Sequence, residues 1–552
     1  MTDKRRGVLG SFPATYWVTI VMEFFERGSY YGMMSILSVY MTEKLGFAKE
    51  GVGLIKGTIQ PILYFLPIIS GALADRFGYR RTLTVAFTLL AGGYLLTSQM
   101  TSYATVFLAL CLMALGAGTF KPIISGSIAR LTDKSNSTLA FGIYYWSINL
   151  GAFLFPLFLV PYLKAADPSW RWVIIAAAIG TGIMLLPTLT LYKEPPLPER
   201  KTGRQTNLVQ TLANAFEIIY SPLILLFIKI RQNRRSAGRI YGALGIVLIA
   251  ALWLFSRQGS FLLLYICLIM AGCLLILHFR NGSAPLQKWL PWGILAVVGA
   301  VLGLLPGLSL FARIVSGVIY LSVFALFKIE ADDQAKFTDY LHFLVLICIY
   351  SGFWILYFQM FDSVLWYVKD YVDATSLDRV INALLTRVGI AYRWHFDVEH
   401  VTVINAGTII LLQILVSYLV RNTRALPTMM VAIGLATLGM AILAINTNIW
   451  VFLVGITIFS IGEMTAHPKF ISYVGQTAPR ERLATFMGYI FLYGVLGSSI
   501  GAVLGARLYV HFVDQIHQPR ILWLIFSMIG VLTIAGLYLY HRLIGQSRAQ
   551  AE

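Results

Sequence analysis

The feature that most constrains this chain is a succession of apolar stretches, each about 20 residues long, that runs through almost the whole sequence. A helix needs roughly 20 mostly apolar residues to cross a bilayer. Charged residues make up only 12% of the chain and hydrophobic residues 58%, whereas soluble domains have about 25% charged residues. We therefore expect an all-α polytopic membrane protein, because the strands of a membrane barrel would alternate polar and apolar residues.

Twelve of these stretches fall into two sets of six, and we expect each stretch to form one membrane-spanning helix. The first set covers residues 16–40, 52–74, 83–99, 106–129, 139–163 and 172–191, and the second covers residues 338–368, 403–420, 427–444, 449–473, 485–508 and 522–541. Two related helix bundles are a common plan of transporters. We predict an N-terminal bundle over residues 1–195, a linker over residues 196–336 and a C-terminal bundle over residues 337–552.

The linker is unusually long and changes character along its length. Residues 208–230 are basic and amphipathic, which predicts a helix lying along the cytoplasmic membrane surface. Apolar segments at residues 241–255 and 261–279 predict one helical hairpin. Residues 290–305 and 311–327 form either a second hairpin or one broken, re-entrant pair. Both bundles must keep their cytoplasmic loops on one side, so the linker adds two or four spans and the total is 14 or 16 helices.

Positive charge is concentrated in short loops between the apolar stretches. The chain has 43 Lys and Arg residues against 25 Asp and Glu residues, a net charge of +18. In a soluble protein this excess would suggest nucleic-acid binding. Here the positive residues lie before the first span and after the even-numbered spans, and loops rich in positive residues face the cytoplasm by the positive-inside rule. We therefore expect both termini in the cytoplasm and no nucleic-acid partner.

Ionisable residues inside the first apolar stretch are the strongest functional signal. Glu23, Glu26, Arg27 and Tyr30 are spaced i, i+3, i+4 and i+7, so they share one face of a helix, and Tyr31 extends it. A charge within the membrane costs at least about 2.5 kcal/mol and must face protein or water. Two carboxylates beside one guanidinium leave a negative excess that needs another cation or a proton. This pattern is typical of a proton-coupling device.

Among the other ionisable residues of the predicted spans, we single out three. Lys121, midway through the fourth span, is the cation available to the acids of the first, and Glu463 is an acid of the tenth span. Either residue could instead snorkel to the headgroups from a helix end, but both have apolar flanks. Asp362 lies either within the seventh span or near its end. The sequence contains no metal-ligand cluster, phosphate-binding glycine loop or nucleophile elbow, so we expect neither a metal site nor an enzyme.

Several motifs resemble those of a known family. Residues 71–81, GALADRFGYRR, resemble the loop between spans two and three of the major facilitator superfamily, in which glycines allow close helix packing and Asp and Arg residues lock the cytoplasmic face. The matching positions are Gly71, Asp75, Arg76, Gly78, Arg80 and Arg81. Four further motifs are similar to those of the proton-dependent oligopeptide transporter family within that superfamily. They are the ExxER stripe followed by Tyr-Tyr-Gly, Ile-Asn-x-Gly at residues 148–151, Gly-x-x-x-x-Lys-Pro at residues 116–122, and Gly462-Glu463.

The resemblance implies two six-helix bundles with two to four extra helices between them. It also implies a symporter that uses the proton gradient to import di- and tripeptides by alternating access. The resemblance assigns proton coupling to Glu23, Glu26, Arg27, Lys121 and Glu463. It assigns peptide binding to Tyr30, Tyr31, Tyr64, Lys121, Asn149, Asn405 and Glu463. It assigns gating to Asp362. It implies no cofactor besides the proton, a bacterial inner membrane as the location and a functional monomer.

Two positions depart from the family pattern. Many members have an arginine where this chain has Met34, and that arginine can pair with an acid of span seven. We therefore expect this pair to be absent or rebuilt, with Asp362 left without a partner. Met34 also keeps open another substrate on the same fold, such as nitrate or an organic anion. A non-transporting scaffold is a weaker alternative, because it has no reason to bear buried charges. His467, one turn after Glu463, is either a packed histidine or a proton relay.

Overall fold

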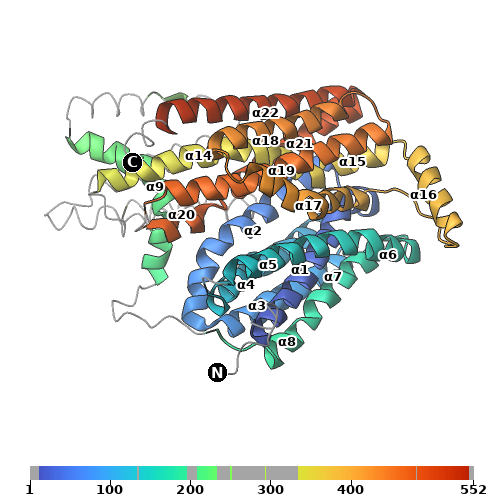
Figure 1. Cartoon of the computed structure of the whole chain (residues 1–552), viewed down its shortest axis with the longest axis horizontal. Coiled ribbons are helices and arrows are strands. Elements are labelled where there is room, and N and C mark those ends of the chain that lie inside the picture. The colour runs from blue at the N-terminus through green and yellow to red at the C-terminus, as the bar shows by residue number, and fades with distance from the viewer. Residues whose placement is uncertain are drawn as a thin grey trace. The chain divides into compact units, whose positions relative to one another are not determined.

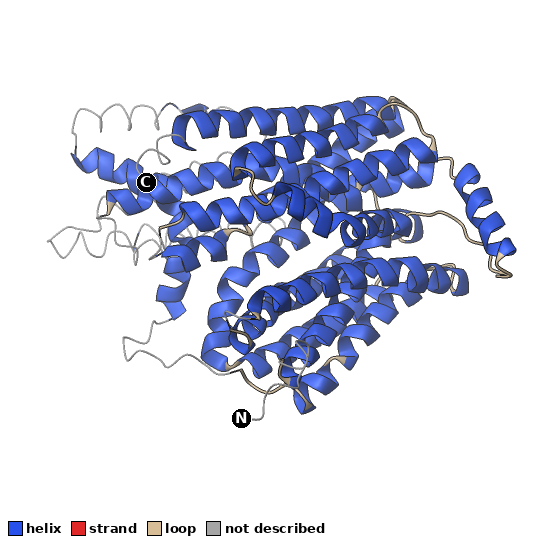
Figure 2. Ribbon diagram, in the orientation of Figure 1, coloured by secondary structure: helices blue, strands red, loops and turns tan. Residues whose placement is uncertain are grey.

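The computed structural model describes residues 12–133, 136–195, 208–232, 333–479 and 482–545, together with residues 246, 249, 250 and 293. Within these ranges the regular structure is helical, apart from one isolated bridge between Asp373 and Asn448 (Figure 2). The chain forms two compact units. The main unit comprises Met1–Glu199 and Ile347–Glu552, and the linker unit comprises Arg200–Leu346.

The first bundle of the main unit contains a helix for each of the six spans predicted before the linker. The elements are α1 (Ala14–Val39) with a π-helical end (Tyr40–Lys44), α2 (Lys49–Phe77), α3 (Tyr79–Gln99), α4 (Tyr103–Leu131), α5 (Ser137–Leu154) continued by η3 (Phe155–Leu159) and α6 (Val160–Ala166), and α7 (Arg171–Ile183) with α8 (Leu185–Thr190).

The second bundle likewise contains the six spans predicted after the linker. Its elements are α14 (Gln334–Phe358), η5 (Gln359–Phe361) and α15 (Ser363–Tyr371), α17 (Glu399–Val420), α18 (Ala425–Leu443), α19 (Ile449–Thr477), α20 (Leu483–Tyr489) and α21 (Leu492–Tyr509) with η7 (Val510–Gln515), and α22 (Pro519–Tyr540) with η8 (His541–Gly545). In the described part, ten helical segments are long and apolar enough to cross a membrane, and these include every span of the two bundles except α1 and α3.

Successive spans of the main unit run in opposite directions, so their connections gather at two ends. We refer to the end that holds residues 40–48, 167–170 and 372–398 as the distal end, and to the end that holds residues 12–13 and 421–424 as the terminal end. A short helix that the sequence analysis did not predict, α16 (Thr375–Arg387), lies at the distal end, near the ends of α6 and α15 (Figure 1).

The two bundles meet along α2 and α21, and α17 contacts α1 and α5. Glycine permits the close approach of α2 to α21. A Cβ atom on Gly53 would lie 2.6 Å from the Cβ of Ala506 and 2.7 Å from the carbonyl oxygen of Ala502, and one on Gly57 would lie 3.3 Å from the carbonyl oxygen of Ser499. The spacing of the bundles along this seam therefore depends on the missing side chains.

The linker unit contains α9 (Leu208–Gln232), which confirms the helix predicted over residues 208–230. Glu217 of α9 forms an ion pair with Lys336 in the first turn of α14. The position of α9 on a membrane surface stays a prediction, as do the domain boundaries. The four apolar segments predicted between residues 241 and 327 lie outside the described residues, apart from isolated helical positions, so the total of 14 or 16 helices also stays a prediction.

Candidate functional site

The ionisable stripe on α1 is buried in the main unit. Glu23, Glu26 and Arg27 are only 2%, 0% and 4% exposed. Arg27 Nε donates a hydrogen bond to Glu26 Oε2 and lies 3.5 Å from Glu23 Oε1. The second oxygen of each carboxylate has no hydrogen-bond partner among the described residues. One guanidinium therefore serves two acids, and the group can still accept one proton or one more positive charge.

Lys121 lies on α4, the helix predicted to supply that charge. Its ammonium is within electrostatic range of Glu23 and Glu26, but it forms no ion pair with either acid among the described residues. Lys121 Nζ lies instead 4.5 Å from the centroid of the Tyr64 ring, a cation–π contact. Arg27, and not Lys121, is thus the direct partner of Glu26 in this conformation.

Glu463 of α19 is held by an amide from a neighbouring helix. Asn405 of α17 donates from Nδ2 to Glu463 Oε2 at 2.8 Å, and the same nitrogen lies 2.9 Å from Ser460 Oγ. Both Glu463 and Asn405 are half-buried. The structure therefore brings together two residues that the resemblance placed in the peptide-binding set, and it fixes one oxygen of the carboxylate.

The other predicted binding residues have different surroundings. The Tyr30 ring lies 5.1 Å from Arg27 Cζ and 5.3 Å from the Tyr31 ring, so these aromatic side chains extend the α1 stripe. Tyr31 also contacts Phe361 of the second bundle, with 6.1 Å between the ring centroids. Asn149 donates from Nδ2 to the carbonyl of Tyr145 one turn earlier in α5, so part of its hydrogen-bonding capacity is used within its own helix.

Four rings form an aromatic belt that contacts Lys121 through Tyr64 and includes His467, one turn after Glu463 on α19. We define the belt as Tyr64, Trp354, Tyr493 and His467. Trp354 and Tyr493 stack with 4.4 Å between ring centroids, and Tyr64 lies 6.3 and 6.4 Å from them. His467 meets both Trp354 and Tyr493 edge to face at 5.5 Å. The sequence contains aromatic residues at these positions, but nothing in their spacing indicates that four helices bring them together.

Asp362 has a partner, which corrects the expectation drawn from Met34. Lys56 of α2 forms an ion pair with Asp362 Oδ1, and Lys56 Nζ also donates to the carbonyl of Phe361 at 2.6 Å and to Ser38 Oγ at 2.9 Å. Lys56 is 0% exposed and Asp362 2%. We refer to Lys56, Asp362, Ser38 and the Phe361 carbonyl as the distal lock. The pair is thus rebuilt from another helix, and sequence analysis gave Lys56 no role.

Other ion pairs also join the bundles near the distal lock. Lys164 Nζ at the end of α6 lies 2.7 Å from both Asp397 Oδ2 and Glu399 Oε2. Lys49 at the start of α2 pairs with Asp514 at 2.8 Å. Every ion pair between the bundles in which both residues are described lies at the distal end. The bundles are therefore fastened together at that end in this conformation.

The motif at residues 71–81 connects helices of the first bundle at the terminal end. Gly78, with φ +94°, adopts a conformation that favours glycine, and a Cβ there would approach Glu194 Oε1 to 3.2 Å. The Glu194 carboxylate accepts hydrogen bonds from the first two amides of α3, including that of Arg80 at 3.1 Å. Arg80 itself donates to the carbonyl of Thr188 at 3.2 Å. The loop thereby ties α3 to α8.

The remaining residues of that motif differ in their contacts. Gly71 faces α4, where its Cβ would lie 3.7 Å from the Cβ of Pro122. Arg76 and Arg81 are exposed, and Arg76 lies over the Phe77 ring at 5.6 Å. The side chain of Asp75 lies outside the described part of the chain. The gating role that the resemblance gives these residues stays a prediction.

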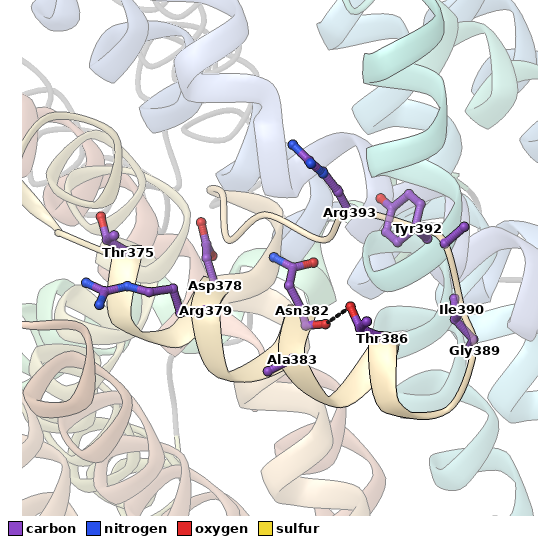
Figure 3. Close-up of a pocket in the computed structure, with 11 residues that line it drawn as sticks. Thr375, Asp378, Arg379, Asn382, Ala383, Thr386, Gly389, Ile390, Tyr392 and Arg393 are labelled. Atoms are coloured by element: carbon purple, nitrogen blue, oxygen red, sulfur yellow. Dashed lines mark hydrogen bonds between the residues drawn. The ribbon is translucent and has the colours of Figure 1, made fainter.

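A separate pocket of about 770 Å³ lies in the hairpin made by α16 and the segment returning along it (Figure 3). Two of its polar side chains, Asn382 and Asp378, hold the hairpin together. Asn382 exchanges two 2.7 Å hydrogen bonds with the backbone of Trp394, and Asp378 accepts from the amide of Phe396 at 2.9 Å. Because backbone groups already satisfy these side chains, we place the candidate site at the α1 stripe, the aromatic belt and Glu463.

Curated relatives match part of the chain, and solved structures match almost all of it. Dipeptide and tripeptide permease B of Photorhabdus luminescens is 30% identical over 216 residues, which cover 38% of this chain and 44% of that protein. Dipeptide and tripeptide permease A of Escherichia coli (strain K12) is 28% identical over 31% of this chain and 35% of that protein. The chain thus spans less than half the length of these two relatives.

Solved structures match almost the whole chain at lower identity. A peptide transporter POT in complex with sulfate has a TM-score of 0.62 at 19% identity and covers 98% of this chain and 96% of its own. A POT family transporter in complex with 5-aminolevulinic acid has a TM-score of 0.61 at 18% identity, with 97% and 96% coverage. These likenesses confirm the predicted fold.

The family assignment rests on a match that covers more than half of the sequence. The model of the Major Facilitator Superfamily matches residues 19–368 of the 552 residues. This range contains the α1 stripe, Lys121 and the loop at residues 71–81, and it extends into the second bundle as far as α15. The apolar helices and this match identify an integral membrane protein. The chain belongs to the Major Facilitator Superfamily.

Proposed function

We propose that the protein is a proton-coupled symporter that imports di- and tripeptides by alternating access. The observation that carries this proposal is the buried α1 stripe, in which Glu23 and Glu26 share the single guanidinium of Arg27. A stripe that is one positive charge short inside an apolar helix is costly unless it takes up a proton or a cation. The dipeptide and tripeptide permeases among the relatives support the substrate class.

The charges around the aromatic belt match the two ends of a peptide. Lys121 is half-buried and has no ion-pair partner among the described residues, so it can receive a carboxylate, with Arg27 as a second cation nearby. Glu463 is half-buried and held by Asn405, so it can receive an amine. The rings of the belt offer contacts that tolerate different side chains. A zwitterionic peptide bound this way neutralises both groups at once.

We assign the proton to Glu26. When the distal end is open, Glu26 takes up a proton and the peptide binds, which satisfies the charges and permits the bundles to rock. When the distal end closes and the terminal end opens, Glu26 loses the proton and returns to the cations beside it, and the peptide is released. In the closed distal conformation the cation in contact is Arg27, so we place Arg27 before Lys121 in this step. Binding and protonation must favour each other reciprocally.

The orientation and setting follow from the same proposal. The distal end faces outward and the termini lie in the cytoplasm of a bacterial cell, with the protein in the inner membrane. The distal lock then closes the outer gate in the conformation described above. Apart from the uptake and release of the coupled proton, no step of the proposed cycle makes or breaks a covalent bond. We therefore propose a carrier that needs no cofactor and is not an enzyme, and we propose that it acts as a monomer.

Uptake by reconstituted protein tests the proposal. Purified full-length protein in liposomes, under an inward proton gradient, should accumulate labelled dialanine, and a protonophore should abolish the accumulation. Folded protein that takes up no dipeptide would refute peptide transport. Nitrate, small organic anions and 5-aminolevulinic acid, the ligand of one structural neighbour, are the solutes to test next. A protein that moves none of them would favour the scaffold alternative.

A further inference from the structure

His467 is a polar group of the aromatic belt that the transport cycle does not use. Its imidazole lies edge-on to Trp354 and Tyr493, which are 5% and 2% exposed, whereas His467 is only half-buried. It forms no hydrogen bond with another described residue, and its Nδ1 atom is buried without a partner. A packed histidine normally satisfies at least one ring nitrogen, because leaving a buried polar atom unpaired is costly.

The position of His467 relative to Glu463 indicates what could satisfy it. Residues spaced i, i+4 on a helix have Cβ atoms about 5–6 Å apart on one face. In an amino-terminal residue with a β-hydroxyl, the amine nitrogen and the hydroxyl oxygen are separated by about 3 Å, given standard bond lengths. With the amine at Glu463, a short polar side chain on the same residue can therefore reach the next turn of α19.

The chemistry of the imidazole fits a neutral polar group. A neutral histidine has one nitrogen that donates and one that accepts, so it can pair with a hydroxyl or a carboxamide. The neighbouring rings of Trp354 and Tyr493 offer mostly apolar contacts, which accept a methyl group and an isosteric hydroxyl with little distinction. Trp354 Nε1 is also buried without a hydrogen-bond partner among the described residues, but an indole can only donate, whereas the imidazole can both donate and accept.

We propose that His467 determines substrate specificity by hydrogen-bonding a hydroxyl or carboxamide on the amino-terminal side chain of a bound peptide. This inference rests on the proposed function and specifies which peptides the same site prefers. It makes His467 a binding residue, and not a relay for the coupled proton. Because an apolar side chain would cover the half-buried imidazole without pairing either of its nitrogens, apolar first residues should bind more weakly.

Two isosteric dipeptides test the inference. Threonyl-alanine and valyl-alanine differ by a hydroxyl in place of a methyl group on the first side chain. Each would compete against labelled dialanine uptake in liposomes containing the full-length protein. We expect threonyl-alanine to inhibit at a concentration about fivefold lower, as one additional hydrogen bond would give. In His467→Phe the ratio of the two inhibitory concentrations should fall to about one, and His467→Asn should retain part of it.

The ratio is measured within each variant, so a change in overall transport rate cancels. Tyr350→Phe is the matched control, because it removes a hydroxyl from a buried ring that lies 5.5 Å from Tyr493 and stacks on Phe470; its ratio should equal that of the wild type. Equal competition in the wild type, or a preference that survives in His467→Phe, would overturn the inference while dialanine uptake upholds the proposed function. Absence of dialanine uptake would overturn both.

Discussion

Lys56 and Asp362 form an ion pair between the two bundles, and both side chains are almost completely buried. An ammonium has three donors, and here each has an acceptor: Asp362 Oδ1, the Phe361 carbonyl and Ser38 Oγ. This pairing offsets the desolvation of the ammonium, which costs several kcal/mol per ion, whereas Asp362 Oδ2 has no hydrogen-bond partner among the described residues. The lock therefore forms only when α2 and the break between α14 and α15 lie side by side.

A double-mutant cycle should separate the interaction between Lys56 and Asp362 from the cost of burying each charge. Lys56→Met leaves the Asp362 carboxylate buried without its cation, and Asp362→Leu leaves the ammonium without its anion. Removing one partner of a buried pair typically costs about 3–5 kcal/mol, whereas replacing both by apolar residues is often neutral. We expect each single variant to lower the melting temperature of the purified protein and the double variant to recover most of the loss.

One outcome of the double-mutant cycle would contradict the lock. If the losses in the two single variants simply add in the double variant, the side chains do not interact, and the lock would not be a unit. Lys49→Met is a useful comparison, because its partner Asp514 is much more exposed than Asp362. Removal of that surface pair should change the melting temperature far less.

The pairing of Lys164 with Asp397 should persist across the pH range of a proton gradient. Burial raises the pKa of Asp397, but the Lys164 ammonium and the Val398 amide outweigh it and hold this pKa below its ordinary value. A lowered folded-state pKa means that the stabilisation is present above the unfolded pKa of about 4 and is lost as the pH falls through the folded pKa.

Melting temperatures measured across a range of pH test the direction of this pH dependence. The difference between the wild type and Asp397→Asn should be constant from about pH 8 to pH 5 and shrink only below about pH 4. A difference that disappears between pH 7 and pH 5 would contradict this assignment and would make the contact a proton sensor. On the expected result, Asp397 does not carry the coupled proton.

Glu26→Gln should separate transport from coupling. The amide keeps the size of the side chain but cannot take up a proton, so proton-driven accumulation of dialanine should be lost, while exchange of labelled for unlabelled dialanine should persist. Lys121→Ala should also lose accumulation, because it removes the cation on the Tyr64 ring. The control is Glu50→Gln, an exposed acid at the start of α2, which should accumulate normally. Full accumulation by Glu26→Gln would move the proton to another group.

Gly53→Ala should destabilise the seam between α2 and α21. The added Cβ would meet the Ala506 Cβ and the Ala502 carbonyl well inside van der Waals distance, and such overpacking typically costs about 1–3 kcal/mol. Gly142→Ala on α5 is the control, since no described atom outside its own helix lies within 4 Å of the added Cβ. We expect a lower melting temperature for the first variant only. Equal melting temperatures would mean that the helices can separate at no cost.

Sequence reasoning succeeded where the relevant geometry is local. The i, i+3, i+4 spacing of Glu23, Glu26 and Arg27 places them on one helix face, and the structure has them in contact there. The twelve core spans were likewise predicted from apolar length. These inferences needed only the geometry of a single helix.

The parts that sequence reasoning missed depend on which helices become neighbours. Lys56 has no local signal that connects it with Asp362, because α2 and η5 meet only when the bundles pack. The belt has the same origin, since Tyr64 lies on α2, Trp354 on α14, His467 on α19 and Tyr493 on α21. The α16 helix was missed for a different reason: it is short, and tertiary hydrogen bonds from Asp378 and Asn382 hold the segment that returns along it.

The break at Gln359–Phe361 brings a main-chain atom into the lock. Because the helix is interrupted there, the carbonyl of Phe361 is available to Lys56, and the hydroxyl of Ser38 provides another oxygen. The ammonium of one bundle therefore binds the backbone of the other bundle as well as a side chain. Separating the bundles must break this backbone contact, which no change of rotamer at Asp362 can avoid.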